Sequence, residues 1–120
     1  VWHSPRLFNK QISNPDVRFL VAKEGERIVG LSTVIRGNDR GIVIARFYIH
    51  PSSQGQGIGK SLYRESLASF PDSLRARIEV DEHNRRGLAF FEKNGFAPTG
   101  SRQEDIEGTR IGLLILEKAL

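Results

Sequence analysis

The apolar positions of this chain alternate with polar ones in its first half and change to a helical spacing in its middle. Val17 to Ala22, Arg27 to Ile35 and Ile42 to His50 are rich in β-branched and aromatic residues and are separated by turn residues. Short runs of this kind, bounded by Gly, Asn and Asp, are typical of strands joined by hairpins. We therefore expect an antiparallel meander in the first half.

From Ile58 to Phe70 the apolar residues recur at intervals of three and four, which predicts an amphipathic helix that Pro71 ends. Ala76 to Val80 alternates again and predicts a strand. Two further runs, Ala97 to Gln103 and Thr109 to Glu117, predict a final pair of strands.

Capping signals predict two more helices. A Ser-Pro pair opens the segment Ser4 to Ile12, which reads as a short helix closed by Asn14-Pro15-Asp16. Asn84 is a good N-cap for a helix over Arg85 to Asn94, which is followed by a glycine where a left-handed residue ends many helices. Together the elements predict one α+β domain over residues 1–120, with a mixed, mostly antiparallel sheet flanked by helices.

Composition narrows the classes of function. The chain has no Cys, which excludes disulfides and thiolate nucleophiles, and its three His show no metal-ligand spacing, so we predict no metal site. No apolar run approaches the ~20 residues of a membrane-spanning helix, and we expect a cytoplasmic protein without a membrane partner. The net charge of +4 suits a polyphosphate or nucleic acid, but the Lys and Arg residues never form a run. Nucleic-acid binding is therefore the weakest of the functions considered.

Three alternating glycines lie between a predicted strand and a predicted helix, in the turn Gln54 to Lys60. Glycines permit positive φ and leave the backbone open to a ligand, and N–H groups at a helix start can bind one anion. The spacing fits neither of two common phosphate motifs. Gln54 stands where the nucleotide-binding P-loop needs its first glycine, and glycines at 55, 57 and 59 do not match the dinucleotide pattern Gly-x-Gly-x-x-Gly.

The pattern Gln/Arg-x-x-Gly-x-Gly/Ala is matched by Gln54, Gly57 and Gly59, and here the sequence resembles the GNAT acetyltransferase superfamily. The strand Arg46 to Pro51 looks like the fourth strand of that family. Asn84 with the run Ala89 to Phe96 looks like its second signature block, and the order of the elements is similar from Val17 to the end of the chain.

The resemblance implies that the chain binds acetyl-CoA as co-substrate and transfers the acetyl group directly to a primary amine of a small molecule or protein. It implies that a strand N–H polarises the thioester. The implied cofactor-binding residues are Phe47, Tyr48 and Ile49 for pantetheine; Gln54, Gly55, Gln56, Gly57, Ile58, Gly59 and Lys60 for the pyrophosphate; and Asn84 and Phe91 near the thioester. Arg85, Arg86 or Lys93 would reach the 3′-phosphate.

The sequence departs from the family pattern at the catalytic positions. Phe91 stands where many members have a Tyr acid, so Tyr48 is the candidate proton donor, and strand packing is the alternative interpretation of Tyr48. The strand before the glycine turn lacks the usual Glu base, which leaves Glu79, Asp81 and His83 as candidate bases. The alternative interpretation is a solvent-facing charged stripe for Glu79 and Asp81, and an exposed loop residue for His83.

The front of the chain also departs from the family, because no segment matches its first strand and helix. The chain begins at Val1 without an initiator Met. We therefore expect either a truncated front or a strand supplied by a partner chain, and the resemblance favours a homodimer. The leading function is N-acetyl transfer, and the alternative is a CoA-binding sensor or structural domain with little or no catalysis.

Overall fold

The alternating segments of the first half form an antiparallel meander in the computed structural model, which describes residues 6–10, 14–55 and 57–120. Strands β2 (Val17–Glu24), β3 (Arg27–Arg36) and β4 (Gly41–Ile49) pair in sequence order, as predicted. Polar side chains shape two of the turns: Asn14 Oδ1 accepts the Asp16 N–H at 2.9 Å, and Asp39 accepts the N–H at the start of β4.

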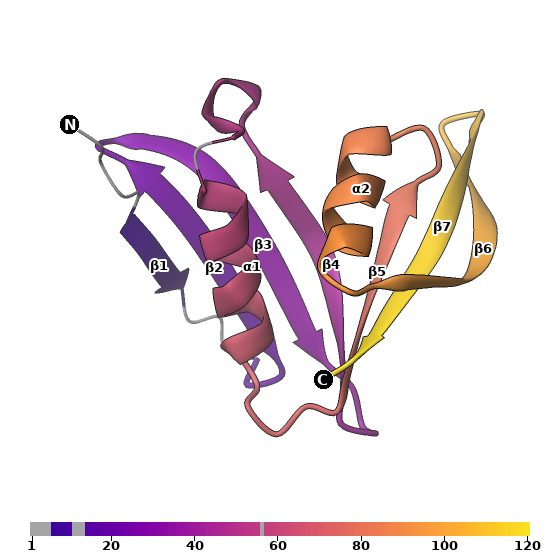
Figure 1. The fold of residues 1–120 in the computed structure, drawn as a ribbon, viewed down its shortest axis with the longest axis horizontal. Coiled ribbons are helices and arrows are strands. Elements are labelled where there is room, and N and C mark those ends of the chain that lie inside the picture. Colours follow the sequence, from indigo (N-terminus) through magenta and orange to yellow (C-terminus); the bar gives the residue numbers. More distant parts are fainter. Residues whose placement is uncertain (1–5, 11–13, 56) are drawn as a thin grey trace.

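The whole sheet has seven strands in the order β1-β2-β3-β4-β5-β7-β6. Every neighbouring pair is antiparallel except β4 and β5, and both α-helices lie on one face of the sheet (Figure 1). The mixed, mostly antiparallel sheet flanked by helices is therefore confirmed. The remaining elements are β1 (Arg6–Lys10), η1 (Pro51–Ser53), α1 (Ile58–Ala68), β5 (Arg75–Asp81), α2 (Arg85–Lys93), β6 (Ala97–Ile106) and β7 (Thr109–Ala119).

The segment ahead of β2 corrects one prediction. A helix was expected over Ser4 to Ile12, but Arg6–Lys10 form strand β1, antiparallel to β2; residues 4, 5, 11 and 12 lie outside the described residues. A Ser-Pro pair expresses only a local preference, whereas pairing along β2 gives the backbone N–H and C=O groups partners that a helix of two turns supplies poorly. β1 thus takes the outer place beside β2, where the resemblance had suggested a lacking strand. No α-helix precedes β2 in the described part of the chain.

The two α-helices begin and end close to their predicted limits. α1 buries Ile58, Leu62 and Tyr63 and ends at Ala68, two residues before the prediction. α2 ends where Gly95 adopts φ +95°, a left-handed conformation that glycine adopts without strain. Neither α-helix is long and apolar enough to cross a membrane.

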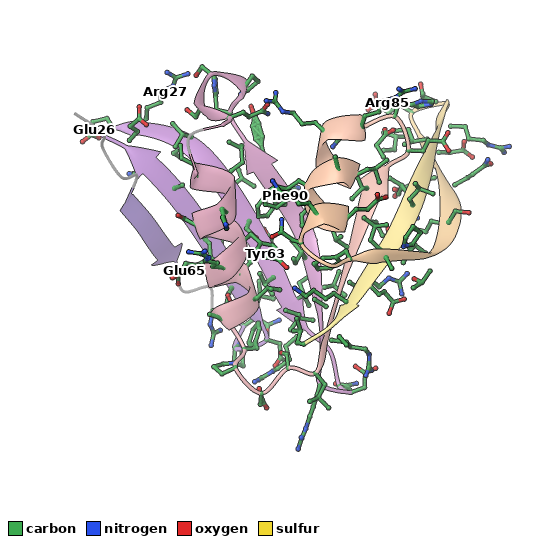
Figure 2. All side chains as sticks on the ribbon, viewed as in Figure 1. Glu26, Arg27, Tyr63, Glu65, Arg85 and Phe90 are labelled. Atoms are coloured by element: carbon green, nitrogen blue, oxygen red, sulfur yellow. The ribbon has the colours of Figure 1, made fainter. Side chains whose placement is uncertain are left out.

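Aromatic rings join the two helices to the sheet. The ring of Phe91 in α2 lies 5.3 Å from that of Phe47 in β4 and 5.4 Å from that of Phe96, centroid to centroid. Tyr63 of α1 meets Phe90 of α2 edge to face at 5.8 Å, between the two helices (Figure 2). Aromatic pairs of this geometry add roughly 0.5–1.5 kcal/mol each beyond their burial. The position of α2 relative to α1 and β4 is therefore well determined.

β4 and β5 run side by side only at their starts. Their pairing ends at Ile44 and Ile78, although β4 continues to Ile49 and β5 to Asp81. A register shift in the pairing of β4 with β3 leaves Ala45 as a β-bulge, which bends a strand locally. Beyond this bulge the two strands separate (Figure 1), and the side of β4 that faces β5 has no strand partner.

Candidate active site

The separation of β4 and β5 opens a pocket of about 650 Å³. Its walls come from β4, β5, η1, the glycine turn with the start of α1, and α2. Of the site residues predicted from the sequence, those that line it are Phe47, Tyr48, Ile49, Gln54, Gly55, Gly57, Gly59, Lys60, Glu79, Asp81, Asn84 and Phe91. Gln56 lies outside the described residues, and Ile58 does not line the pocket.

The glycine turn presents open backbone to the pocket. Gly55 and Gly57 have φ of +81° and +80°, and none of the described atoms lies within 4 Å of the place that a Cβ would take at either residue. Gly57 is the N-cap of α1, and no described side chain caps this helix start by a hydrogen bond. The first N–H groups of α1 are therefore available to an anion, which the helix dipole also favours. The turn fits the phosphates of a CoA-type ligand.

Ile58 and Gly59 lie at the inner side of the turn. A Cβ on Gly59 would stand 3.6 Å from Ile49 and from Phe90, which is ordinary contact distance. The Ile58 side chain is 1% exposed and packs in the core beneath α1. The contact with pyrophosphate that was predicted for Ile58 can therefore be made only by its backbone N–H.

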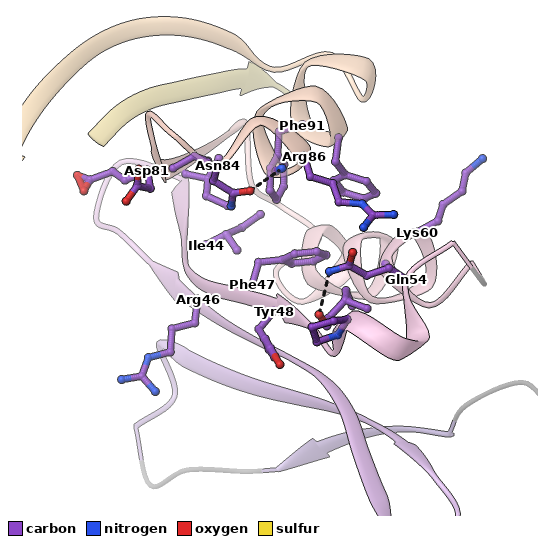
Figure 3. A pocket seen from close by; sticks show the side chains of 18 of the residues that line it. Ile44, Arg46, Phe47, Tyr48, Gln54, Lys60, Asp81, Asn84, Arg86 and Phe91 are labelled. Carbon is purple, nitrogen blue, oxygen red and sulfur yellow. Dashed lines mark hydrogen bonds between the residues drawn. The ribbon is translucent and has the colours of Figure 1, made fainter. Parts of the chain in front are cut away.

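Gln54 holds the turn to the end of β4. Its side-chain Nε2 donates a hydrogen bond to the Ile49 carbonyl at 3.3 Å (Figure 3). One of its two side-chain N–H groups is therefore used within the protein. The remaining one is the donor that a phosphate could accept from.

Two cations stand near the glycine turn, and we call them the cationic end of the pocket: Lys60 of α1 and Arg86 of α2. Lys60 extends outward from the start of α1, while Arg86 reaches from α2 toward the α1 side (Figure 3). Arg85 and Lys93, the other two candidates for a phosphate contact, do not line the pocket.

Asn84 fixes the wall that α2 contributes. Its Oδ1 accepts the Gly87 N–H at 3.0 Å, which caps the helix start as predicted (Figure 3). A Cβ on Gly87 would stand 2.6 Å from Asn84 Nδ2, so a larger residue there would require the Asn84 side chain to shift. Phe91, about two helical turns later, lines the pocket but is only 3% exposed, and its phenyl ring has no proton to donate.

We call the side of the sheet opposite α1 and α2 the open face. Phe47 packs against the aromatic rings of α2, so its neighbours Arg46 and Tyr48 leave β4 on the open face. The same alternation on β5 places Glu79 and Asp81 there. All four line the pocket, and Tyr48 is 44% exposed. The pocket thus reaches from the cationic end, on the helix side, to the open face.

Glu79 is engaged by two arginines. Arg102 Nε lies 2.9 and 2.8 Å from its two carboxylate oxygens, and Arg77 lies 3.6 Å away. The hydrogen bonds from Arg102 hold the pKa of the Glu79 carboxyl below its ordinary value, against the opposing effect of burial. A carboxylate with a lowered pKa is a weaker base, which counts against Glu79 as the general base.

Asp81 differs from Glu79 because no described cation pairs with it. Its Oδ1 accepts the His83 N–H at 2.8 Å, which positions the carboxylate at the end of β5. The His83 side chain is 87% exposed, lies near Glu82 and does not line the pocket. Asp81 is therefore the candidate base that combines a place in the pocket with a carboxylate not occupied by an arginine.

Sequence reasoning missed Arg102 and Phe90. Arg102 is 23 positions from Glu79 and reaches it because β6 pairs with β7 and β7 pairs with β5. Only the strand order and register bring Arg102 and Glu79 together, and no local sequence pattern predicts either of them. Phe90 belongs to the apolar row of α2, but such a row indicates a core position as readily as a site residue.

Comparison with known proteins identifies the family to which this geometry belongs. Residues 2–110 match the model of the acetyltransferase (GNAT) domain, so the chain belongs to the GNAT family. It is 33% identical over 101 residues to an uncharacterised N-acetyltransferase of Mycobacterium tuberculosis, a match covering 82% of this chain and 65% of that protein. The chain thus spans slightly less than two thirds of the length of this relative.

Solved structures agree with the fold. A GNAT acetyltransferase from Elizabethkingia anophelis with acetyl-CoA bound superposes with a TM-score of 0.78 over 98% of this chain and 99% of that one, at 14% identity. The PaiA N-acetyltransferase of Thermoplasma acidophilum, in complex with coenzyme A, has a TM-score of 0.69 and 27% identity over 88% of this chain and 62% of that one. The first likeness concerns the fold alone.

Proposed function

We propose that this chain is an acetyl-CoA-dependent N-acetyltransferase that transfers an acetyl group to a primary amine. The observation that carries the proposal is the pocket between β4 and β5. Among the described residues it has a helix start without a side-chain cap and left-handed glycines at one end, and a carboxylate without an ion-pair partner at the other. The names of the relatives support the same chemistry, because the proteins they describe are N-acetyltransferases.

In this proposal the glycine turn, Lys60 and Arg86 bind the phosphates of acetyl-CoA. The unpaired edge of β4 from Phe47 to Ile49 offers backbone N–H and C=O groups to the pantetheine arm. Hydrogen bonds from backbone donors to the thioester oxygen would stabilise the negative charge that develops there. The rings of Phe47 and Phe91 exclude water from this side of the pocket.

The chemical step is a direct displacement. The neutral amine attacks the thioester carbonyl carbon, a C–N bond forms, and the C–S bond breaks with release of the CoA thiolate. The surplus proton on nitrogen passes to the Asp81 carboxylate, and the Tyr48 hydroxyl protonates the thiolate before solvent restores it. Because thiols have a pKa near ~8.5, the thiolate leaves without strong acid assistance.

A second candidate, CoA binding without catalysis, is favoured by two observations. Phe91 lacks an ionisable group, and Glu79 is held in ion pairs. Release of free CoA from acetyl-CoA, followed across a panel of amines, separates the two functions, with calorimetric binding of acetyl-CoA measured alongside. Turnover with any amine supports the enzyme, and tight binding without turnover favours the second candidate. Absence of binding would overturn both.

Three further properties are proposed: one domain over residues 1–120, a cytoplasmic location and, from the family resemblance, a homodimer. Light scattering coupled to size-exclusion chromatography tests the dimer. A mass of about one chain at micromolar concentration would contradict it.

A further inference from the structure

Three polar side chains meet at the turn that follows β4, and we call Arg27, His50 and Ser52 the His50 cluster. Arg27 Nη2 donates a hydrogen bond to Ser52 Oγ at 2.9 Å and lies 3.1 Å from each ring nitrogen of His50. His50 Nδ1 accepts the Ser52 N–H at 3.2 Å and lies 2.8 Å from Ser52 Oγ. The cluster thus joins the start of β3, where Arg27 lies beside this turn (Figure 2), to the end of β4 and to η1.

The segment that the His50 cluster contacts leads directly into the glycine turn. The His50 carbonyl accepts the Ser53 N–H at 2.8 Å, which closes η1. Gln54 follows, and its side chain returns to the Ile49 carbonyl at 3.3 Å. Pro51 and Gln54 line the pocket, whereas no member of the His50 cluster does. The cluster therefore fixes the approach to the turn from outside the pocket.

The contacts of His50 require a neutral ring. Nδ1 accepts a backbone N–H and so carries no proton, which leaves the proton of the neutral imidazole on Nε2. Arg27 is the charged group that faces the ring, and no carboxylate among the described residues lies within ion-pair distance of it. A second proton would replace the acceptor at Nδ1 by a donor and would place two cations 3.1 Å apart. Protonation of His50 therefore breaks the contacts of the cluster.

We propose that the His50 cluster positions the glycine turn for acetyl-CoA, and that protonation of His50 weakens binding of this cofactor. The inference rests on the proposed function, because it concerns the cofactor that the turn binds. Three residues, 54–56, separate η1 from Gly57, the N-cap of α1. A change in the position of η1 is therefore carried to the N–H groups at the start of α1. Arg27, His50 and Ser52 are positioning residues, since they act on the ligand through this backbone.

The test measures the dissociation constant of acetyl-CoA by calorimetry at pH 8 and pH 5.5. His50→Ala should raise this constant about fivefold at pH 8, the size of one lost hydrogen bond. His50→Asn should stay within about twofold of the unmodified chain at pH 8, because the oxygen of an Asn side chain accepts the N–H two residues on in many turns. At pH 5.5 the unmodified chain should bind about threefold to fivefold more weakly than His50→Asn, since an imidazole gains a proton in this range and an amide does not.

The comparison between variants is the measurement, because the 3′-phosphate of the ligand also gains a proton near pH ~6 and affects every variant alike. His83→Asn is the matched control: His83 is 87% exposed, does not line the pocket and lies outside the His50 cluster. It should bind acetyl-CoA as the unmodified chain does at both pH values. If His50→Asn and the unmodified chain bind alike at pH 5.5, the positioning role is overturned. Tighter binding by the unmodified chain at pH 5.5 would also overturn it, because protonated His50 would then contact a phosphate directly.

Amide hydrogen exchange without ligand separates this inference from the proposed function. At pH 8 the Ser53 N–H should exchange about fivefold faster in His50→Ala than in the unmodified chain, and His50→Asn should restore the slow rate. Absence of acetyl-CoA binding in the unmodified chain would sink the proposed function and reject acetyl-CoA as the ligand of the turn. Equal exchange in all three chains would overturn the positioning role of the His50 cluster, whether or not acetyl-CoA binds.

Discussion

Arg102 Nε lies 2.9 and 2.8 Å from the two carboxylate oxygens of Glu79, and this contact distinguishes the two carboxylates that β5 brings to the pocket. Glu79 is satisfied by an arginine from β6, while Asp81, two residues on and on the same face, accepts only a backbone N–H from the described part of the chain. Two acidic residues that look equivalent in the sequence are therefore unequal as bases.

The first prediction concerns this inequality. Asp81→Asn should lower kcat by about a hundredfold, in the range measured for the loss of a general base. Glu79→Gln should change kcat by less than about twofold, because its oxygen can still accept a hydrogen bond from Arg102. Steady-state release of CoA at saturating acetyl-CoA measures both variants. A larger loss in Glu79→Gln than in Asp81→Asn would show that the roles are reversed.

The second prediction uses the lowered pKa of Glu79. A carboxyl whose pKa is lower in the folded than in the unfolded state stabilises the fold above its unfolded pKa, near ~4.3, and loses that contribution as the pH falls through the folded pKa. Arg102→Leu removes the main cause of the shift. We therefore expect the variant to melt below the unmodified chain at pH 7, and the difference in melting temperature to shrink as the pH falls below about 4.

Arg85→Leu is the matched control for this experiment, because Arg85 is exposed and forms no ion pair among the described residues. Its melting temperature should differ from that of the unmodified chain by a similar amount at every pH. A difference for Arg102→Leu that does not depend on pH would mean that the guanidinium acts by packing rather than through the charge of Glu79.

Local patterns predicted the elements well where one face of each is buried. The alternation around Ile42 and the helical row from Ile58 both arise because one face of the element is buried. The spacing of the apolar residues therefore indicates whether the element is a strand or a helix. The segment Arg6–Lys10 was predicted wrongly because its conformation depends on pairing with β2, which lies outside the window that a capping signal covers. An element whose conformation depends on pairing with another segment cannot be predicted from its own residues, even where their local preference is clear.

The candidate site divides in the same way. The glycine turn is local, so its residues and its place at a helix start could be predicted from Gln54 to Lys60. The contact of Arg102 with Glu79 depends on the register of three strands and could not be. Most of the pocket residues could be predicted from the sequence, although Phe90 was missed and Ile58 does not line the pocket. Which charges are neutralised within the pocket could not be predicted.

The third prediction concerns the start of α2. Asn84→Ala should lower the free energy of unfolding by about 1 kcal/mol, because the N–H of Gly87 loses its acceptor. Asn84→Asp should keep most of this stability, since a carboxylate oxygen caps a helix as well as an amide oxygen does. Urea denaturation measures both. Equal losses in the two variants would indicate that the amide nitrogen, and not the cap, is what the fold requires.

The last prediction separates the backbone strain of the glycine turn from its role in binding. Gly57 and Gly108 have φ of +80° and +83°, and a Cβ at either would meet no described atom within 4 Å. Alanine at either position should therefore cost a similar amount of stability, about 1–2 kcal/mol.

Of the two glycines, only Gly57 lines the pocket, whereas Gly108 lies in the turn between β6 and β7. Gly57→Ala should weaken acetyl-CoA binding by at least about tenfold, because a methyl group would stand where the phosphates approach the N–H groups of α1. Gly108→Ala should bind acetyl-CoA normally, and calorimetry on both variants, with melting temperatures to match their stabilities, makes the comparison. Unchanged affinity in Gly57→Ala would place the phosphates elsewhere than at the turn.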